Sequence, residues 1–313
     1  MEDVSKYAVA DAEVPLRLEK ILRKRLKLNN TIRVFKELEM PLVPVLADME
    51  YAGVSLDESF FKEFSLELSQ RMTKIEKEIY QSLGYSININ STQQLSKALF
   101  EKLGLQPPDR SKKTKSGFYS TSASVLEEMR GQHPVVDWVL EYRELAKLVS
   151  TYLDALPKQI NPRTGRVHTS FNQTGSVTGR LASSNPNLQN IPTRTELGHK
   201  VRQGFIAKAG HVLLSVDYSQ IELRIVACMS KDEAMLNAFR AGQDIHATTA
   251  AAIYSLPIEE ITKEQRRHAK AINFGLIYGM SAFGLSRTSG LTLAEAEDFV
   301  KAYFKRFPAV KQY

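Results

Sequence analysis

The chain has 313 residues, of which 43% are hydrophobic and 25% charged, so it is long enough for two or three globular domains. Basic residues exceed acidic ones by seven, which weakly favours a polyanionic partner. Cys228 is the only cysteine, which excludes an internal disulfide and suits a reducing compartment. Its apolar neighbours in Ile225–Met229 predict a buried, structural thiol.

Membrane and secretory classes are also disfavoured. No apolar run approaches the roughly 20 residues that a spanning helix needs. The first residues, MEDVSKYAVADAE, are acidic and lack the apolar core of a signal peptide. We therefore expect no membrane partner and a cytoplasmic location.

Two helical patterns open the chain. Residues 1 to about 30 predict a helix whose later part is crowded with basic residues. From Phe61 to Ile79, apolar residues recur every three or four positions, which predicts a long amphipathic helix. Gly84 is placed to end that helix.

A basic loop lies between two further helical segments. Residues 88–104 predict a short helix-rich module, and residues 133–156 predict a second long helix that Pro157 stops. The loop between them, 107–119, carries a cluster of cations: Arg110, Lys112, Lys113 and Lys115. Such a loop suits sliding contact with phosphates, and an ordinary solvated loop is the alternative.

The pattern then changes from helix to strand and turn. Residues 166–173 alternate polar and apolar side chains, which predicts a strand. Residues 178–192 are rich in turn formers and amides, and an Asn-capped loop is the simplest interpretation. Val212–Val216 is nearly all apolar, as in a strand buried on both faces, and Asp217 follows directly. A carboxylate there could hold a hard cation, or it could simply cap a turn.

The last third is organised around one helical stripe. Arg266, Lys270, Phe274 and Tyr278 recur every fourth residue, so two cations and two rings would share one face. That order suits an elongated ligand with phosphates and a flat base, whereas a basic amphipathic helix with its rings in the core is the alternative. Gly275 and Gly279 would sit in the same helix and let something flat approach the backbone. An amphipathic helix is expected over 293–307.

Three stretches resemble motifs of one family, the family A DNA polymerases of the bacterial DNA polymerase I type. R-x-x-x-K-x-x-x-F-G-x-x-Y-G, from Arg266 to Gly279, resembles motif B, which is the fingers helix of that family. DYSQIELR, from Asp217 to Arg224, resembles motif A. TGRLASSNPNLQNIP, Thr178–Pro192, is similar to the segment that follows the primer–template minor groove.

The resemblance implies an α+β fold with right-hand polymerase architecture: mostly helical thumb and fingers, and a partial antiparallel palm sheet. The expected divisions are an exonuclease-like stub (1–35), the thumb with its linker (36–157), the partial palm (158–232) and the fingers (233–313). YAVAD, Tyr7–Asp11, resembles the last motif of the family's proofreading exonuclease. The D-x-E segment that would complete that metal site is missing, so no exonuclease activity is expected.

The resemblance also implies roles for single residues around the nucleotide. Asp217 and the Tyr218 carbonyl would bind two Mg²⁺ ions, and Arg266 and Lys270 would bind the triphosphate and neutralise the leaving pyrophosphate. Other contacts implied for the nucleotide and the templating position come from Glu222, His246, Phe274 and Tyr278. Glu222 would exclude ribonucleotides, although Ser219-x-x-Glu222 also fits a structural capping box. Asp244 is expected to be a helix N-cap.

Contacts to DNA are implied at two places. The basic loop matches the tip of the family's thumb, which assigns Lys112, Lys113 and Lys115 to the DNA backbone. In the segment that follows the minor groove, Arg180, Asn187 and Gln189 match the hydrogen-bond donors. Their chemistry suits the acceptors that all base pairs share in that groove.

The implied reaction is template-directed transfer of a nucleotide from a deoxynucleoside triphosphate to a primer 3′-hydroxyl, by a monomer. The family's second metal carboxylate lies in a His-Asp-Glu segment that this sequence does not contain. We therefore expect the 313-residue chain alone to be inactive or severely impaired. One alternative is a non-catalytic primer–template or nucleotide-binding fragment. A single-subunit RNA polymerase relative is less favoured because Glu222 leaves no room for a ribose, and a purely structural protein is least favoured.

Overall fold

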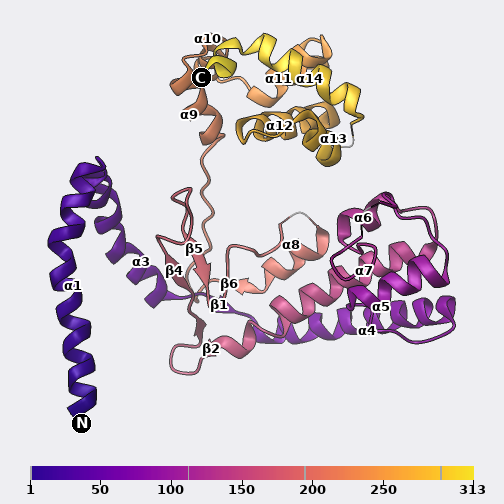
Figure 1. Ribbon diagram of the computed structural model, residues 1–313, viewed down its shortest axis with the longest axis horizontal. Helices are drawn as coiled ribbons and strands as arrows, with labels where there is room; N and C mark the ends of the chain where they lie inside the picture. The colour runs from indigo at the N-terminus through magenta and orange to yellow at the C-terminus, as the bar shows by residue number, and fades with distance from the viewer. Residues whose placement is uncertain (1, 112, 194, 290) are drawn as a thin grey trace. The chain divides into compact units, whose positions relative to one another are not determined.

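The computed structural model describes residues 2–111, 113–193, 195–289 and 291–313 (Figure 1). The chain divides into two units, one up to Leu213 and one from Leu214 to Tyr313, and each has its own hydrophobic core. Helices dominate both units, as the sequence patterns predict. Among the described helices, none is both long enough and apolar enough to cross a membrane.

Helix α4 (Glu58–Leu83) is the long amphipathic helix that the sequence predicts. It begins where the Asp57 side chain accepts a hydrogen bond from the Phe60 backbone N–H at 3.0 Å. It ends at Gly84, whose φ of +79° is a left-handed conformation that glycine adopts at no steric cost. Its three-and-four spacing puts one set of apolar side chains into the core: Phe61, Phe64, Leu68, Ile75 and Ile79.

Helix α7 (Pro134–Leu148) packs against α4 and continues as a π-helical turn, η3 (Val149–Leu153). The two helices lie side by side in Figure 1. Leu145, Leu148 and Tyr152 are buried and Trp138 is partly buried, as expected for the inward face of this helix.

Apart from α1, the other helical segments of the first unit are shorter than α4 and α7. Most residues of helix α1 whose burial is described are exposed, and Leu16, for example, is 75% exposed. The remaining segments are α1 (Glu2–Leu28), α2 (Ile32–Val34), η1 (Phe35–Glu39), α3 (Met40–Ala52), α5 (Thr92–Ser96), η2 (Lys97–Lys102), α6 (Ala123–Glu128), η4 (Pro157–Gln159) and α8 (Glu196–Gln203).

The described strands form three small antiparallel sheets. The pairs are β1 (Ser55–Leu56) with β6 (Phe205–Ile206), β2 (Ile160–Asn161) with β3 (Arg166–Val167), and β4 (Ser170–Asn172) with β5 (Ala182–Ser184). The single strand predicted over 166–173 is therefore split into β3 and β4. The break lies at His168, whose Nδ1 is 2.7 Å from the carbonyl oxygen of Glu50.

The apolar segment Val212–Val216 is extended but belongs to no strand, so the prediction of a buried strand is wrong. Val212, Leu214 and Val216 are more than 80% exposed. A strand needs a neighbour for its backbone groups and cover for its faces, and no described residue supplies either.

The described part of the second unit contains helices and no strand. Its core gathers Leu223 and Ala227 with apolar residues of the later helices, among them Ile272, Tyr303 and Phe307. Its elements are α9 (Ile221–Ser230), α10 (Glu233–Arg240), α11 (Ile245–Tyr254), η5 (Ile258–Glu260), α12 (Lys263–Ile277), α13 (Ala282–Ser289), α14 (Leu293–Arg306) and α15 (Pro308–Gln312).

Cys228 is exposed, which contradicts the prediction of a buried thiol. Helix α9 turns Leu223 and Ala227 into the core and leaves Ile225 and Met229 about half exposed. Arg224 lies one turn before Cys228 on this exposed face, whereas the sequence neighbours of Cys228 at 225–229 are all apolar and do not indicate which face packs.

Candidate functional site

Helix α12, which carries the predicted stripe, begins with a capping box. The Thr262 hydroxyl accepts a hydrogen bond from the Gln265 backbone N–H at 3.2 Å, and the Gln265 side chain accepts one from the Thr262 N–H at 2.9 Å. This reciprocal pair satisfies two N–H groups at the start of the helix. It fixes the first turn, from which Arg266 projects.

The end of α12 is a Schellman motif. The N–H of Met280 bonds to the Gly275 carbonyl at 2.8 Å, and that of Gly279 bonds to the Leu276 carbonyl at 3.0 Å. Gly279 therefore lies just beyond the helix, with φ of +73°, and Tyr278 is the C-cap. Gly275 is buried, and a Cβ there would lie 3.2 Å from Met280 Sδ, so the chain itself covers this part of the helix backbone. Gly275 lies in α12 as predicted, whereas Gly279 does not, and the burial of Gly275 does not support the prediction that a flat ligand approaches the backbone there.

The stripe lies on the accessible side of α12. Arg266 and Phe274 are half-buried and Lys270 is exposed, while Tyr278 at the helix end is 62% exposed. The opposite side carries the buried residues Ala269, Ile272 and Asn273. The alternative in which both rings pack into the core therefore fails for Tyr278 and holds only in part for Phe274.

Asp244 is the N-cap of α11, as predicted, and it also contacts the stripe. Its Oδ1 accepts hydrogen bonds from the backbone N–H groups of His246 and Ala247, at 2.9 and 3.2 Å. Its Oδ2 lies 2.7 Å from both Nε and Nη2 of Arg266. The start of α11 is thus tied to the first cation of the stripe.

His246 lies beneath the stripe rather than on it. It is 2% exposed, and its ring centroid is 5.7 Å from that of Phe274. Burial lowers the pKa of His246 to about 4, which Asp244 opposes and the charges of Arg266 and Lys270 reinforce. The imidazole is therefore neutral at pH 7.

Asp217, Tyr218 and Glu222 precede or open α9. Asp217 is exposed and forms no hydrogen bond or ion pair with a described residue, and Tyr218 is 79% exposed. Helix α9 begins at Ile221 with Gln220 as its N-cap, one residue later than a cap at Ser219 would require. The predicted capping box of Ser219 and Glu222 is therefore wrong.

The oxygen donors at this point suit a hard cation. An exposed carboxylate and an adjacent carbonyl are ligand types that Mg²⁺ prefers. In the described ranges, however, no three His, Cys, Asp or Glu side chains cluster as a metal site. Asp217 and the Tyr218 carbonyl thus fit one part of a magnesium site.

The basic loop forms a tight turn in the first unit. The Thr114 N–H bonds to the Phe118 carbonyl at 2.7 Å, and Lys113 pairs with Tyr119 in an isolated bridge. Lys113 Nζ lies 5.1 Å from the Tyr119 ring centroid, while Lys115 is exposed at the turn. Lys112 lies outside the described residues.

The amides predicted to contact DNA are held by their oxygens. Asn187 Oδ1 accepts a bond from the Gln189 N–H at 3.0 Å, and Gln189 Oε1 accepts one from the Ser183 N–H at 3.2 Å. Their amide N–H groups are therefore the part left to donate to a ligand. Arg180 is exposed just before β5, whereas Asn187 and Gln189 follow that strand.

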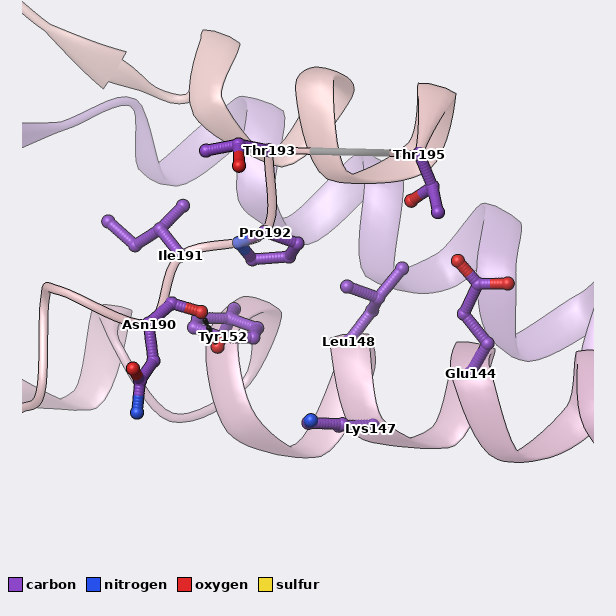
Figure 2. Close-up of a pocket in the computed structure, with 9 residues that line it drawn as sticks. All are labelled: Glu144, Lys147, Leu148, Tyr152, Asn190, Ile191, Pro192, Thr193 and Thr195. Atoms are coloured by element: carbon purple, nitrogen blue, oxygen red, sulfur yellow. Dashed lines mark hydrogen bonds between the residues drawn. The ribbon is translucent and has the colours of Figure 1, made fainter. Parts of the chain in front are cut away.

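The structure adds Lys147, which the sequence analysis missed, to this surface. Helix α7 and the segment around Asn190 enclose a cavity of about 350 Å³, where Figure 2 shows the Tyr152 hydroxyl bonded to the Asn190 carbonyl. Lys147 lines this cavity and a neighbouring one of about 500 Å³, which Asn187 also lines. No short motif marks Lys147, because only the fold brings α7 to this loop.

Two cations and an aromatic ring lie on the accessible side of a helix, over a buried neutral histidine, and such groups suit a ligand with phosphates and a flat base. Comparisons with known proteins place the chain in one family. The sequence model of DNA polymerase family A matches residues 58–313. The chain therefore belongs to DNA polymerase family A.

Relatives place the chain within the DNA polymerase I type. It is 45% identical to DNA polymerase I of Chloroflexus aurantiacus and 48% identical to that of Pseudomonas aeruginosa. Both matches cover 100% of this chain, which spans about a third of these relatives, 33% and 34%. The solved POL domain of Pol1 from M. smegmatis, in complex with DNA primer-template and dNTP, matches with a TM-score of 0.87. That match is 36% identical and covers 95% of this chain and 52% of that chain.

Proposed function

We propose that the chain serves template-directed DNA synthesis, in which a nucleotide passes from a deoxynucleoside triphosphate to a primer 3′-hydroxyl. The observation that carries the proposal is the accessible face of α12, with Arg266, Lys270 and Phe274 one turn apart. Family membership and the likeness to a POL domain solved with primer-template and dNTP support it.

The residues of α12 would each bind a different part of the nucleotide. The planar guanidinium of Arg266 suits two phosphate oxygens at once, and the Lys270 ammonium adds a mobile point charge. Together they would offset charge that develops on the leaving pyrophosphate. Phe274 would meet the sugar and base, and Tyr278 would border the templating position. Glu222 would close the space that a ribose hydroxyl needs.

Magnesium ions would be held at the other end of the site by the Asp217 carboxylate and the Tyr218 carbonyl. When bound, they would stabilise charge on the attacking and leaving oxygens. Because the described ranges contain no group of three His, Cys, Asp or Glu side chains that could hold a metal ion, we expect the 313-residue chain by itself to bind substrates without extending a primer.

Primer–template DNA would contact the first unit. Lys112, Lys113 and Lys115 would meet phosphates, while Arg180, Asn187 and Gln189 would donate to the minor groove. Lys147 joins this set because it lines the same cavity as Asn187.

The proposal includes the right-hand division of the chain: thumb over 36–157, partial palm over 158–232 and fingers over 233–313. Residues 1–35 would belong to an exonuclease-like domain. The complete enzyme would act as a monomer.

Two binding measurements and one assay test the proposal. Primer–template binding is measured by fluorescence anisotropy, deoxynucleotide binding by calorimetry, and primer extension in magnesium with all four deoxynucleotides. Lys270→Ala should weaken deoxynucleotide binding about tenfold or more, because a hydrogen bond to a charged group is lost. Lys301→Ala, at an exposed lysine of α14, is the matched control and should have little effect.

Each outcome has a meaning. If the chain binds no deoxynucleotide, or if both lysine variants bind alike, the proposed site is wrong. Extension that Asp217→Ala abolishes would show a working metal site and refute the expected inactivity. Binding without extension would also agree with the second candidate, a non-catalytic binding fragment, since the described ranges contain no group of three His, Cys, Asp or Glu side chains that could hold a metal ion. The relatives named above are DNA polymerases, which disfavours the alternative of an RNA polymerase.

A further inference from the structure

The two oxygens of the Asp244 carboxylate bind different parts of the second unit. Oδ1 accepts from two backbone N–H groups at the start of α11, at 2.9 and 3.2 Å. Oδ2 is 2.7 Å from both Nε and Nη2 of Arg266 on α12. One carboxylate therefore joins a helix terminus to the first cation of the nucleotide stripe.

This geometry makes Asp244 a fixed anchor. The carboxylate cannot turn toward solvent without losing the cap of α11, and the positive end of that helix favours its charge. Burial opposes ionisation, yet hydrogen bonds from Arg266 and from the N–H of Ala247 keep the pKa of Asp244 below its ordinary value. Asp244 is thus ionised throughout the neutral range.

The anchor constrains Arg266 and leaves it able to bind. A guanidinium has five N–H donors, and Asp244 engages one on Nε and one on Nη2. Three donors are left for phosphate oxygens, in a plane that the carboxylate sets. Without the contact to Asp244, the Arg266 side chain would have to lose its rotamer freedom when the ligand binds.

A carboxylate near a polyanion also repels it, so the two effects must be weighed. The charge of Asp244 is already compensated by Arg266 and by the N-terminus of α11. Lys270, which forms no ion pair with a described residue, supplies the uncompensated charge. For the binding of a polyanion, the orientation that Asp244 gives to Arg266 therefore outweighs the repulsion from the Asp244 charge.

We propose that Asp244 is a positioning residue that orients the Arg266 guanidinium to receive the phosphates of the nucleotide. The proposal rests on the proposed function and adds to it a residue outside the α12 stripe. In this proposal the two cations have different roles. Lys270 supplies uncompensated positive charge, and Arg266, oriented by Asp244, presents its N–H groups to the phosphates in a fixed direction.

The test uses the 313-residue chain with two probes, inorganic tripolyphosphate and deoxythymidine triphosphate, and dissociation constants from calorimetry. Asp244→Asn is the central variant, because asparagine caps helices about as well as aspartate but lacks the charge. It should raise both dissociation constants by about three- to tenfold, the range for freeing one long side chain. Asp57→Asn makes the same change at the N-cap of α4 and should stay within about twofold of wild type.

A double-mutant cycle separates positioning from a general effect on α11. In an Arg266→Ala background, Asp244→Asn should change either dissociation constant by less than about twofold, because no guanidinium is left to orient. Urea unfolding of each variant verifies that all are folded.

The outcomes discriminate between the two proposals. Equal or tighter binding by Asp244→Asn, or a loss that persists in the Arg266→Ala background, overturns the role of Asp244 and leaves the proposed function standing. If the wild type binds neither probe, or if Arg266→Ala binds as the wild type does, the nucleotide site fails and the role of Asp244 fails with it.

Discussion

The side-chain amide nitrogen of Asn273 lies 3.0 Å from Nδ1 of His246, and both residues are buried. The same nitrogen donates to the Thr249 hydroxyl at 3.1 Å, and that hydroxyl donates to the Ile245 carbonyl at 2.7 Å. Both amide hydrogens of Asn273 are thus used. Because Nδ1 accepts, the proton of the neutral imidazole lies on Nε2. The histidine that packs against Phe274 of the stripe therefore has its tautomer fixed by the buried Asn273.

A first prediction concerns the pH dependence of stability. Burial lowers the pKa of His246 from 6.5 to about 4, so between these values the unfolded chain binds a proton that the folded chain does not. The free energy of unfolding should be highest above pH 6.5 and fall as the pH drops toward 4, by at most about 1.4 kcal/mol per pH unit from this group. Urea unfolding at pH 7, 6 and 5 measures the slope.

His246→Gln is the control for this slope, because glutamine removes the titration and keeps an acceptor for Asn273. Its stability should depend less on pH over the same interval. A histidine NMR signal that is lost in His246→Gln, and that titrates near pH 6.5 in the wild type, would contradict the prediction.

A second prediction concerns the buried network itself. Asn273→Leu removes the amide and leaves the Nδ1 of His246 and the hydroxyl of Thr249 without their donor. The free energy of unfolding should fall by roughly 2 kcal/mol or more, since unsatisfied buried polar groups cost about 1–3 kcal/mol each. Asn237→Leu, at an exposed position of α10, should change it by about 0.5 kcal/mol or less. Similar losses in the two variants, measured by urea unfolding, would show that the network contributes little.

Local patterns in the sequence predicted the elements that position the stripe. The spacing of Phe61 to Ile79 predicted α4 and its buried face, and the glycine at its end was found in a left-handed conformation. The cap at Asp244 was also predicted, because a short polar side chain before an apolar helix has a local explanation. What the sequence did not reveal was the second use of that carboxylate, since Arg266 is 22 residues away.

The errors arose where burial depends on distant parts of the chain. Val212–Val216 is apolar enough for a buried strand, but burial needs partners that the described residues do not supply. Cys228 has only apolar neighbours in sequence, but it lies one turn after Arg224 on the exposed face of α9. Gly275 was assigned to a ligand because its contact with Met280 depends on how the chain turns after α12.

A third prediction separates the two glycines near the end of α12. At Gly279, φ is +73° and no atom lies within 4 Å of an added Cβ, so Gly279→Ala tests backbone strain alone and should cost about 1 kcal/mol. Gly275→Ala gains about 1 kcal/mol of helix propensity and must only displace the flexible end of Met280. Thermal unfolding should therefore show a larger loss for Gly279→Ala. A larger loss for Gly275→Ala would mean that Met280 cannot yield.

The last prediction concerns Lys147, which only the tertiary structure places beside Asn187. If its ammonium neutralises a DNA phosphate, Lys147→Gln should weaken primer–template binding and reduce the slope of log K against log salt by about 0.9, the value for one counterion released. Lys74→Gln, at an exposed lysine of α4, should leave that slope unchanged. Asn187→Ala should weaken binding without altering the slope, because an amide releases no counterion. Equal slopes for wild type and Lys147→Gln, by anisotropy between 50 and 200 mM salt, would remove Lys147 from the DNA surface.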